Sequence, residues 1–147
     1  MPAQNLVELG EATRRIFEKS AALKASASPE ARAALREIVR SMNSYYSNGI
    51  EGQATHPANI ERALRHDFSD KPDVAKLQRL ALAHIEAERE LEQAVTTEAA
   101  ALSGAFLRQA HTSLYSRLSE EDCMTDDRRI VVPGEHRVHD VAVGRHQ

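Results

Sequence analysis

The sequence contains a single cysteine, Cys123, among its 147 residues. One cysteine cannot form an intrachain disulfide, so the chain is not a disulfide-stabilised secreted module, and we expect a reducing compartment. Aromatic residues make up only 4% of the chain, although β-sheets are enriched in aromatic and β-branched residues. Alanine, leucine, glutamate and arginine dominate instead, and these residues are good helix formers. The composition therefore predicts a mainly α-helical fold.

Two further features are missing, a basic excess and a long apolar run. The net charge is −3, so the chain lacks the basic footprint of nucleic-acid-binding proteins. No apolar run approaches the roughly 20 residues that a membrane-spanning helix needs. Residues 1–10 also lack the basic start and continuous apolar segment of a signal peptide. We expect one globular, cytoplasmic protein that binds neither nucleic acid nor membrane.

Apolar residues recur at helical spacing along most of the chain, which predicts a bundle of roughly five helices. Ser28-Pro29-Glu30 is typical of a helix start, with a capping serine, a proline at the first position and an acid in the first turn. Only the segment after residue 130 alternates, and it predicts a short C-terminal β-hairpin at about 130–144. The predicted helices are 5–24, 29–52, a short helix from 57 to 64, 73–100 and, after an interruption at Ser103-Gly104, 106–118.

The second predicted helix has two different faces. Leu35, Ile38, Met42 and Tyr45 or Tyr46 form its apolar face, which we expect to be buried. Its polar face carries Arg40, Ser44, Ser47 and Glu51, and we expect Gly52 to end the helix.

The segment 47–52, Ser-Asn-Gly-Ile-Glu-Gly, places a hydroxyl and a carboxylate four residues apart. In a helix, Ser47 and Glu51 therefore lie one turn apart on one face. The carboxylate would be held out at the helix end, where it could contact another molecule. An alternative is helix-end chemistry, in which Asn48 is an N-cap and Glu51 the third residue of a capping box.

This segment resembles the inhibitory helix of Fic-domain proteins, which has the pattern Ser or Thr, three residues, Glu, then Gly or Asn. The family comprises protein AMP-transferases. The resemblance implies that Ser47, Glu51 and Gly52 form a regulatory motif, carried on a helix at about 29–52. Glu51 would obstruct productive ATP binding by pairing with an arginine of the catalytic signature.

Two later segments resemble the same family in the family's order. Residues 107–114 are similar to the first core helix, with Ala110 in place of the family's leucine before His111. Residues 133–144 resemble the flap hairpin that docks the target protein. The resemblance implies a flap containing Pro133, Gly134, Arg137, Val141 and Val143. It also implies an N-terminal helical region at 1–100, followed by an incomplete Fic core at 101–147.

The family's catalytic signature, His-Pro-Phe-x-Asp/Glu-Gly-Asn-Gly-Arg, is absent from the sequence. The chain's one His-Pro pair, His56-Pro57, is followed by neither a glycine loop nor an arginine. We therefore expect no catalytic residue and no bound cofactor in this chain alone, with ATP and Mg²⁺ implied only for the complete family protein. The sequence ends at Gln147, where the resemblance places the start of the catalytic helices.

Three functions follow as alternatives. The chain is the regulatory N-terminal portion of a Fic-family adenylyltransferase, a stand-alone antitoxin-like module that inhibits a Fic partner in trans, or a helical interaction protein. The implied partners are the remaining Fic core, a target protein with a Ser, Thr or Tyr hydroxyl, and in some assemblies a second copy of the chain.

The histidines and the cysteine are the remaining candidate metal ligands or nucleophiles, and each has a simpler interpretation. His111 is predicted to be a packed or capping histidine, because its neighbours on a helix are apolar. His136, His139 and His146 suggest a zinc site, but residues three apart in an extended segment point to opposite faces. We therefore predict no metal site. Cys123 has no neighbouring base in the sequence, so we do not expect a reactive thiol.

Overall fold

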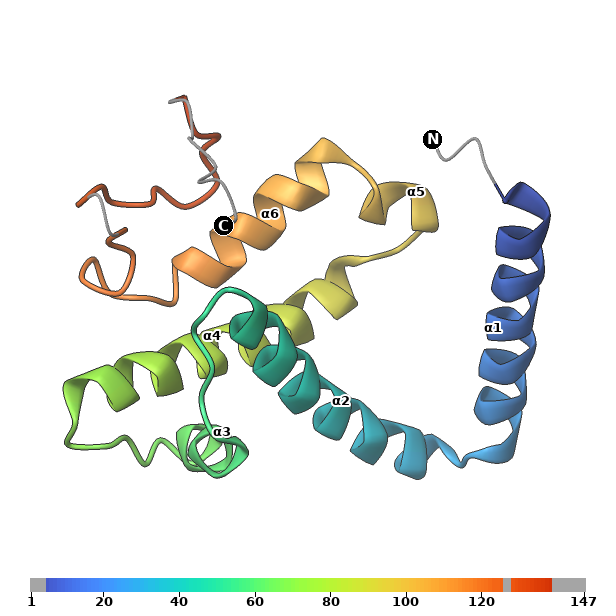
Figure 1. The fold of residues 1–147 in the computed structure, drawn as a ribbon, viewed down its shortest axis with the longest axis horizontal. Coiled ribbons are helices and arrows are strands. Elements are labelled where there is room, and N and C mark those ends of the chain that lie inside the picture. Colours follow the sequence, from blue (N-terminus) through green and yellow to red (C-terminus); the bar gives the residue numbers. More distant parts are fainter. Residues whose placement is uncertain (1–4, 126–127, 139–147) are drawn as a thin grey trace. The chain divides into compact units, whose positions relative to one another are not determined.

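A computed structural model describes residues 5–125 and 128–138 of the chain. These residues form six helices and no β-strand, which confirms the mainly α-helical prediction (Figure 1). The chain divides into two compact units, Met1–Val39 and Arg40–Gln147, and the division falls within the second helix. The helices are α1 (Leu6–Ser26), α2 (Pro29–Ile50), α3 (Pro57–Leu64), α4 (Pro72–Ala94), α5 (Glu98–Ala101) and α6 (Gly104–Tyr115).

The first unit consists of α1 and the start of α2. No residue of α1 is buried. The helix start predicted at Ser28-Pro29 is confirmed, since α2 begins at Pro29 and the Ser28 hydroxyl accepts the backbone N–H of Ala31 at 3.2 Å. A backbone hydrogen bond, and after it a hydrogen bond from the Ser28 side chain, lower the pKa of the exposed Glu30 carboxyl.

The second unit is built around α4, which packs against both α3 and α6. Two side-chain contacts show that α4 and α6 run antiparallel, because Glu90 accepts the Ser113 hydroxyl at 2.9 Å while Arg117 lies 3.5 Å from Glu86. Alanines at positions 75, 81, 83 and 87 of α4 are buried. Small side chains on several sides of one helix allow several neighbours to approach it.

The apolar core of this unit is small and consists of Ile60, Ala81 and Ile85, with the partly buried Tyr45 packed against them. It lies where α2, α3 and α4 meet. Leu77, Leu80, His84 and Leu91 of α4 are half-buried.

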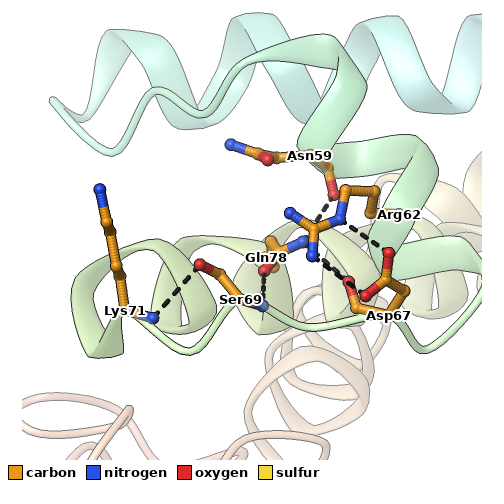
Figure 2. A network of polar contacts seen from close by, with 6 residues as sticks. All are labelled: Asn59, Arg62, Asp67, Ser69, Lys71 and Gln78. Atoms are coloured by element: carbon orange, nitrogen blue, oxygen red, sulfur yellow. Dashed lines mark hydrogen bonds and ion pairs between the residues drawn. The ribbon is translucent and has the colours of Figure 1, made fainter.

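Gln78 of α4 is a fully buried polar residue that joins α3 to α4 (Figure 2). Its Oε1 accepts the backbone N–H of Ser69 at 2.7 Å. Its Nε2 donates to the carbonyls of Asn59 and Asp67 at 3.2 and 3.1 Å. Arg62 and Asp67 form a two-pronged ion pair at 2.8 and 3.0 Å across the same loop. These bonds satisfy backbone groups that the loop could not pair by itself.

The orientation predicted for α2 was right only for Tyr45, which is half-buried and packs against the core. Arg40, Ser44 and Asn48 are the buried residues of the helix, whereas Leu35, Ile38, Met42 and Tyr46 are exposed. Ser44 donates its hydroxyl to the carbonyl of Ala81 at 3.2 Å and accepts the side-chain amide of Asn48 at 3.3 Å. Arg40 pairs with Glu92. Small polar side chains with partners on α4 therefore occupy the interface that the apolar pattern had predicted for larger residues.

Two predicted boundaries also changed. The long helix ends at Ala94 rather than near Ala100, and a separate turn of helix, α5, follows it. The break coincides with Val95-Thr96-Thr97, whose β-branched side chains disfavour helix, and the Thr97 hydroxyl caps α5 by accepting the N–H of Ala100 at 3.1 Å. The last helix ends at Tyr115 rather than Leu118. The predicted division of the chain at residue 100 stays a prediction.

The predicted hairpin is not found within the described residues. They contain only an isolated antiparallel bridge between Met124 and Ile130. At Pro133-Gly134 the chain turns tightly, with the N–H of Glu135 bonded to the carbonyl of Val132 at 3.2 Å. Gly134 has a φ of 77°, as the third position of a type II turn requires. The second arm of the predicted hairpin, with Val141 and Val143, lies outside the described residues.

Candidate functional site

The sequence motif lies at the C-terminal end of α2. The N–H of Gly52 bonds to the carbonyl of Gly49 at 3.1 Å, and the N–H of Gln53 bonds to the carbonyl of Asn48 at 2.7 Å. This pair of bonds defines a Schellman motif. Gly52 has a φ of 73°, a conformation that glycine adopts without strain. The prediction that Gly52 ends the helix is confirmed.

Ser47 and Glu51 are both exposed at this helix end. Ser47 lies in the last turns of α2, and Glu51 is the first residue after Ile50, within the capping turn. The capping-box alternative is wrong, because Asn48 lies inside α2 and bonds to Ser44 instead of starting a helix. The motif therefore presents one hydroxyl and one carboxylate at a helix terminus.

The helix end that carries the motif is attached to α4 by polar contacts. Ser44 and Asn48 form a buried pair on the carbonyl of Ala81, and Asn43 donates to the carboxylate of Glu88 at 3.2 Å. Thr55, just after the motif, is also buried, and its hydroxyl has no hydrogen-bond partner among the described residues. The polar face of α2 thus positions Ser47 and Glu51 on the second unit.

A second candidate site is an apolar groove of about 520 Å³ between α4 and α6. Its wall on α4 includes Leu91 and Val95, and its wall on α6 includes Phe106 and Leu107. Leu107 is 64% exposed, so a large apolar side chain faces solvent at this place. The other lining residues are His84, Ala87, Glu88, Glu92, Ala110, His111, Leu114 and Tyr115.

Two histidines, His84 and His111, are among the polar groups that line this groove. Burial lowers the pKa of His84, although the nearby Glu88 carboxylate opposes that shift. His111 accepts the backbone N–H of Gly134 on Nδ1 at 2.9 Å, so the neutral ring carries its proton on Nε2. The His111 ring stacks on Tyr115 with centroids 4.5 Å apart. The prediction of a packed, capping histidine at position 111 is confirmed.

The predicted flap residues are only partly brought together. Pro133 and Arg137 are exposed, and Gly134 is held against α6 by His111. A Cβ at Gly134 would lie 2.4 Å from the Thr112 hydroxyl, so the close approach requires glycine. Val141 and Val143 lie outside the described residues. A role for this segment in docking a target stays a prediction.

Sequence reasoning missed the contact that joins the segment after α6 to α4. Arg79 donates to both carboxylate oxygens of Asp122, at 2.5 and 2.9 Å. The guanidinium of Arg79 lowers the pKa of Asp122, whose side chain is only 2% exposed. Burial and the neighbouring carboxylates raise the pKa of Cys123. A thiol that stays protonated is a poor nucleophile.

Within the described residues, no group of three or more His, Cys, Asp or Glu side chains is placed to hold a metal ion. His139 and His146 lie outside those residues. None of the helices described is both long enough and apolar enough to cross a membrane. No protein-family model matches the chain, and neither a curated protein nor a solved structure shows significant similarity to it.

Proposed function

We propose that the chain is the regulatory N-terminal portion of a Fic-family protein adenylyltransferase, in which Glu51 blocks productive ATP binding. The observation that carries the proposal is the placement of Ser47 and Glu51, both exposed at the end of α2. A carboxylate presented at a helix terminus, beside a hydroxyl one turn earlier, suits contact with a cationic group on a neighbouring domain.

The mechanism follows from charge and space. An arginine that would hold the ATP γ-phosphate forms a two-pronged bond equally well with a carboxylate. While Glu51 occupies that arginine, Mg²⁺-bound ATP lacks one of its phosphate contacts. Ser47 carries no charge, so it orients the contact without blocking phosphate. The chain itself contributes no catalytic group and modifies no Ser, Thr or Tyr hydroxyl by itself.

We further propose that the remaining Fic core docks in the groove between α4 and α6. A large part of the groove lining is apolar, and Leu107 is largely exposed. Apolar surface that is left exposed beside a small core is typical of an interface. Leu107→Lys should therefore weaken association with the core, whereas Leu64→Lys on α3, another exposed leucine, should not.

The test is AMP transfer by the chain combined with a Fic catalytic core. Glu51→Gly and Glu51→Gln should both raise incorporation of labelled AMP into a target, and Ser47→Ala should raise it less. Glu61→Gln on α3 is the matched control, because Glu61 is also an exposed glutamate of this unit. Equal rates of AMP transfer for wild type and Glu51→Gln would show that the motif only ends a helix and does not inhibit.

The same assay distinguishes a chain that inhibits a separate core from a chain that inhibits a core to which it is covalently joined. When the core is supplied as a separate polypeptide, an antitoxin-like module should still inhibit it and should bind it with Glu51 intact. A regulatory segment of a single chain should inhibit well only when it is covalently joined, because linkage raises the effective concentration to about the millimolar range.

A further inference from the structure

The tight turn at residues 132–135 is attached to α6 through one side chain. The backbone N–H of Gly134 donates to Nδ1 of His111 at 2.9 Å. Within residues 5–125 and 128–138, this is the one hydrogen bond that joins the segment 132–138 to a helix. The attachment of the turn to α6 therefore depends on the acceptor that His111 supplies.

Gly134 lies close against the surface of α6. A Cβ at this position would lie 2.4 Å from the hydroxyl oxygen of Thr112 and 3.9 Å from the carbonyl oxygen of Arg108. Gly134 is half-buried in this position. A half-buried N–H needs a partner, so the turn keeps this close approach while the ring of His111 accepts that N–H.

The ring of His111 is held in place and remains accessible to protons. It stacks on Tyr115 with centroids 4.5 Å apart and an angle of 32° between the two planes. The side chain of His111 is half-buried rather than enclosed. An imidazole that accepts a hydrogen bond on Nδ1 is neutral, because the protonated ring has two N–H donors and no acceptor. The structure therefore shows the attachment in the neutral state of His111.

We propose that His111 is a pH-sensitive latch, which holds the turn at 132–135 against α6 only while its imidazole is neutral. When a proton from solvent binds to the lone pair of Nδ1, the ring becomes a cation with an N–H on each nitrogen. The new N–H then faces the N–H of Gly134, so a repulsive contact between two donors replaces the hydrogen bond. The turn leaves α6, and water accepts the Gly134 N–H. Imidazole side chains change charge between about pH 5 and pH 8, so the release falls in the physiological range.

Charged and titratable groups surround the ring on three parts of the chain. They are His84, Glu88 and Glu92 of α4, which line the same groove as His111, Arg108 and Tyr115 of α6, and the exposed Glu135, His136 and Arg137 of the segment after the turn.

The groups on α4 are compatible with a cationic ring at His111. The carboxylates of Glu88 and Glu92 line the groove beside it and attract a positive charge. Burial lowers the pKa of His84, so His84 stays neutral over the upper part of the same pH range and does not repel the new cation there. Protonation of His111 thus releases the turn and places a positive charge in the wall of the groove.

The experiment is nuclear magnetic resonance of the 147-residue chain, titrated from about pH 8 to about pH 5. The Gly134 amide signal reports the hydrogen bond, and the nuclear Overhauser effect between the Gly134 Hα atoms and the Thr112 methyl group reports the close contact. Both should follow one titration, and the docked population should fall at least about fivefold across it. The amide signal of Gly104, at the start of α6, should not follow it, because the helix stays folded.

His111→Asn is the deciding variant. The side-chain oxygen of asparagine is bonded to Cγ, as Nδ1 is in histidine, and it accepts a hydrogen bond at every pH in this range. The turn should therefore stay docked throughout the titration. His136→Asn is the matched control, because it removes another histidine two residues from Gly134, and it should keep the transition of the wild type. His111→Phe, which has no acceptor, should leave the turn released at every pH.

Three results would overturn the latch. The first is a docked turn in the wild type at both ends of the titration. The second is a transition that persists in His111→Asn or disappears in His136→Asn, since either would assign the titration to another group. The third is a Gly104 signal that moves together with the Gly134 signal, because the change would then be unfolding of α6 rather than release of the turn.

Discussion

Arg79 and Asp122, 43 residues apart in sequence, form a two-pronged ion pair that ties the segment after α6 to α4. The Asp122 side chain is almost fully buried, whereas Arg79 is partly exposed. Ser119 adds a further bond, because its hydroxyl accepts the N–H of Asp122 at 3.2 Å. Asp122 therefore joins Arg79 and Ser119 in a contact that no local sequence pattern predicts.

Asp122→Asn should destabilise the chain by about 1–3 kcal/mol, because it leaves Arg79 without its carboxylate. The effect should depend on pH. The pKa of Asp122 is lowered in the folded state, so its contribution is complete above the unfolded value of about 3.9 and is lost as pH falls through the folded pKa. Urea unfolding of both proteins at several pH values measures this. A difference that persists undiminished well below the folded pKa would contradict it.

His84 should give a pH dependence in a different window. Burial lowers the pKa of His84 in the folded state. As the pH falls, His84 is therefore protonated in the unfolded chain before it is protonated in the folded chain. Its effect is therefore absent above the unfolded value of about 6.5, and stability is lost as pH falls from there toward the folded pKa. His84→Gln should flatten the stability profile between these two pKa values.

Two glycines three residues apart should respond to alanine with opposite signs. Gly49 lies inside α2, and a Cβ there would meet Ala54 at an ordinary 3.9 Å. Gly49→Ala should therefore stabilise the chain by up to about 1 kcal/mol. Gly52 has a φ of 73°, so Gly52→Ala should destabilise it by about 1–2 kcal/mol. Thermal or urea unfolding of the two variants, side by side, checks the signs.

Gln78→Leu should be strongly destabilising although it conserves most of the side-chain volume. It removes the partners of the Ser69 N–H and of the Asn59 and Asp67 carbonyls. A buried polar group left unpaired costs about 1–3 kcal/mol, and Asn59 and Ser69 are half-buried, so we expect a loss of at least about 2 kcal/mol for the three contacts together. Gln93→Leu, on an exposed position of the same helix, should stay within about 0.5 kcal/mol of wild type. Equal unfolding midpoints for the two variants would refute the role given to Gln78.

Local chemistry made several features of the fold predictable. Ser28-Pro29 and His56-Pro57 mark helix starts, and Gly52 marks a helix end, because caps, proline and positive φ act within a few residues. The Ser47–Glu51 spacing was readable for the same reason, since helical geometry alone sets which residues share a face. The regulatory role of that pair rests on resemblance and stays a proposal.

The packing of α2 was decided only by tertiary structure. Periodicity distinguishes the two faces of a helix, but it does not say which face finds a partner. Ser44 donates a hydrogen bond to the carbonyl of Ala81, and Arg40 forms an ion pair with Glu92. The polar face of α2 is therefore buried there, although the apolar periodicity predicted burial of the other face. Hydrogen bonds and ion pairs between distant residues compensate the cost of burying polar groups, and the sequence does not encode their partners locally. The composition and spacing of this chain determined that it is helical, and its local caps determined the start of α2 at Pro29 and its end before Gly52. The ends of α4 and α6, the contact faces, the ties at Gln78 and Asp122, and the groove between α4 and α6 were decided only in the tertiary structure.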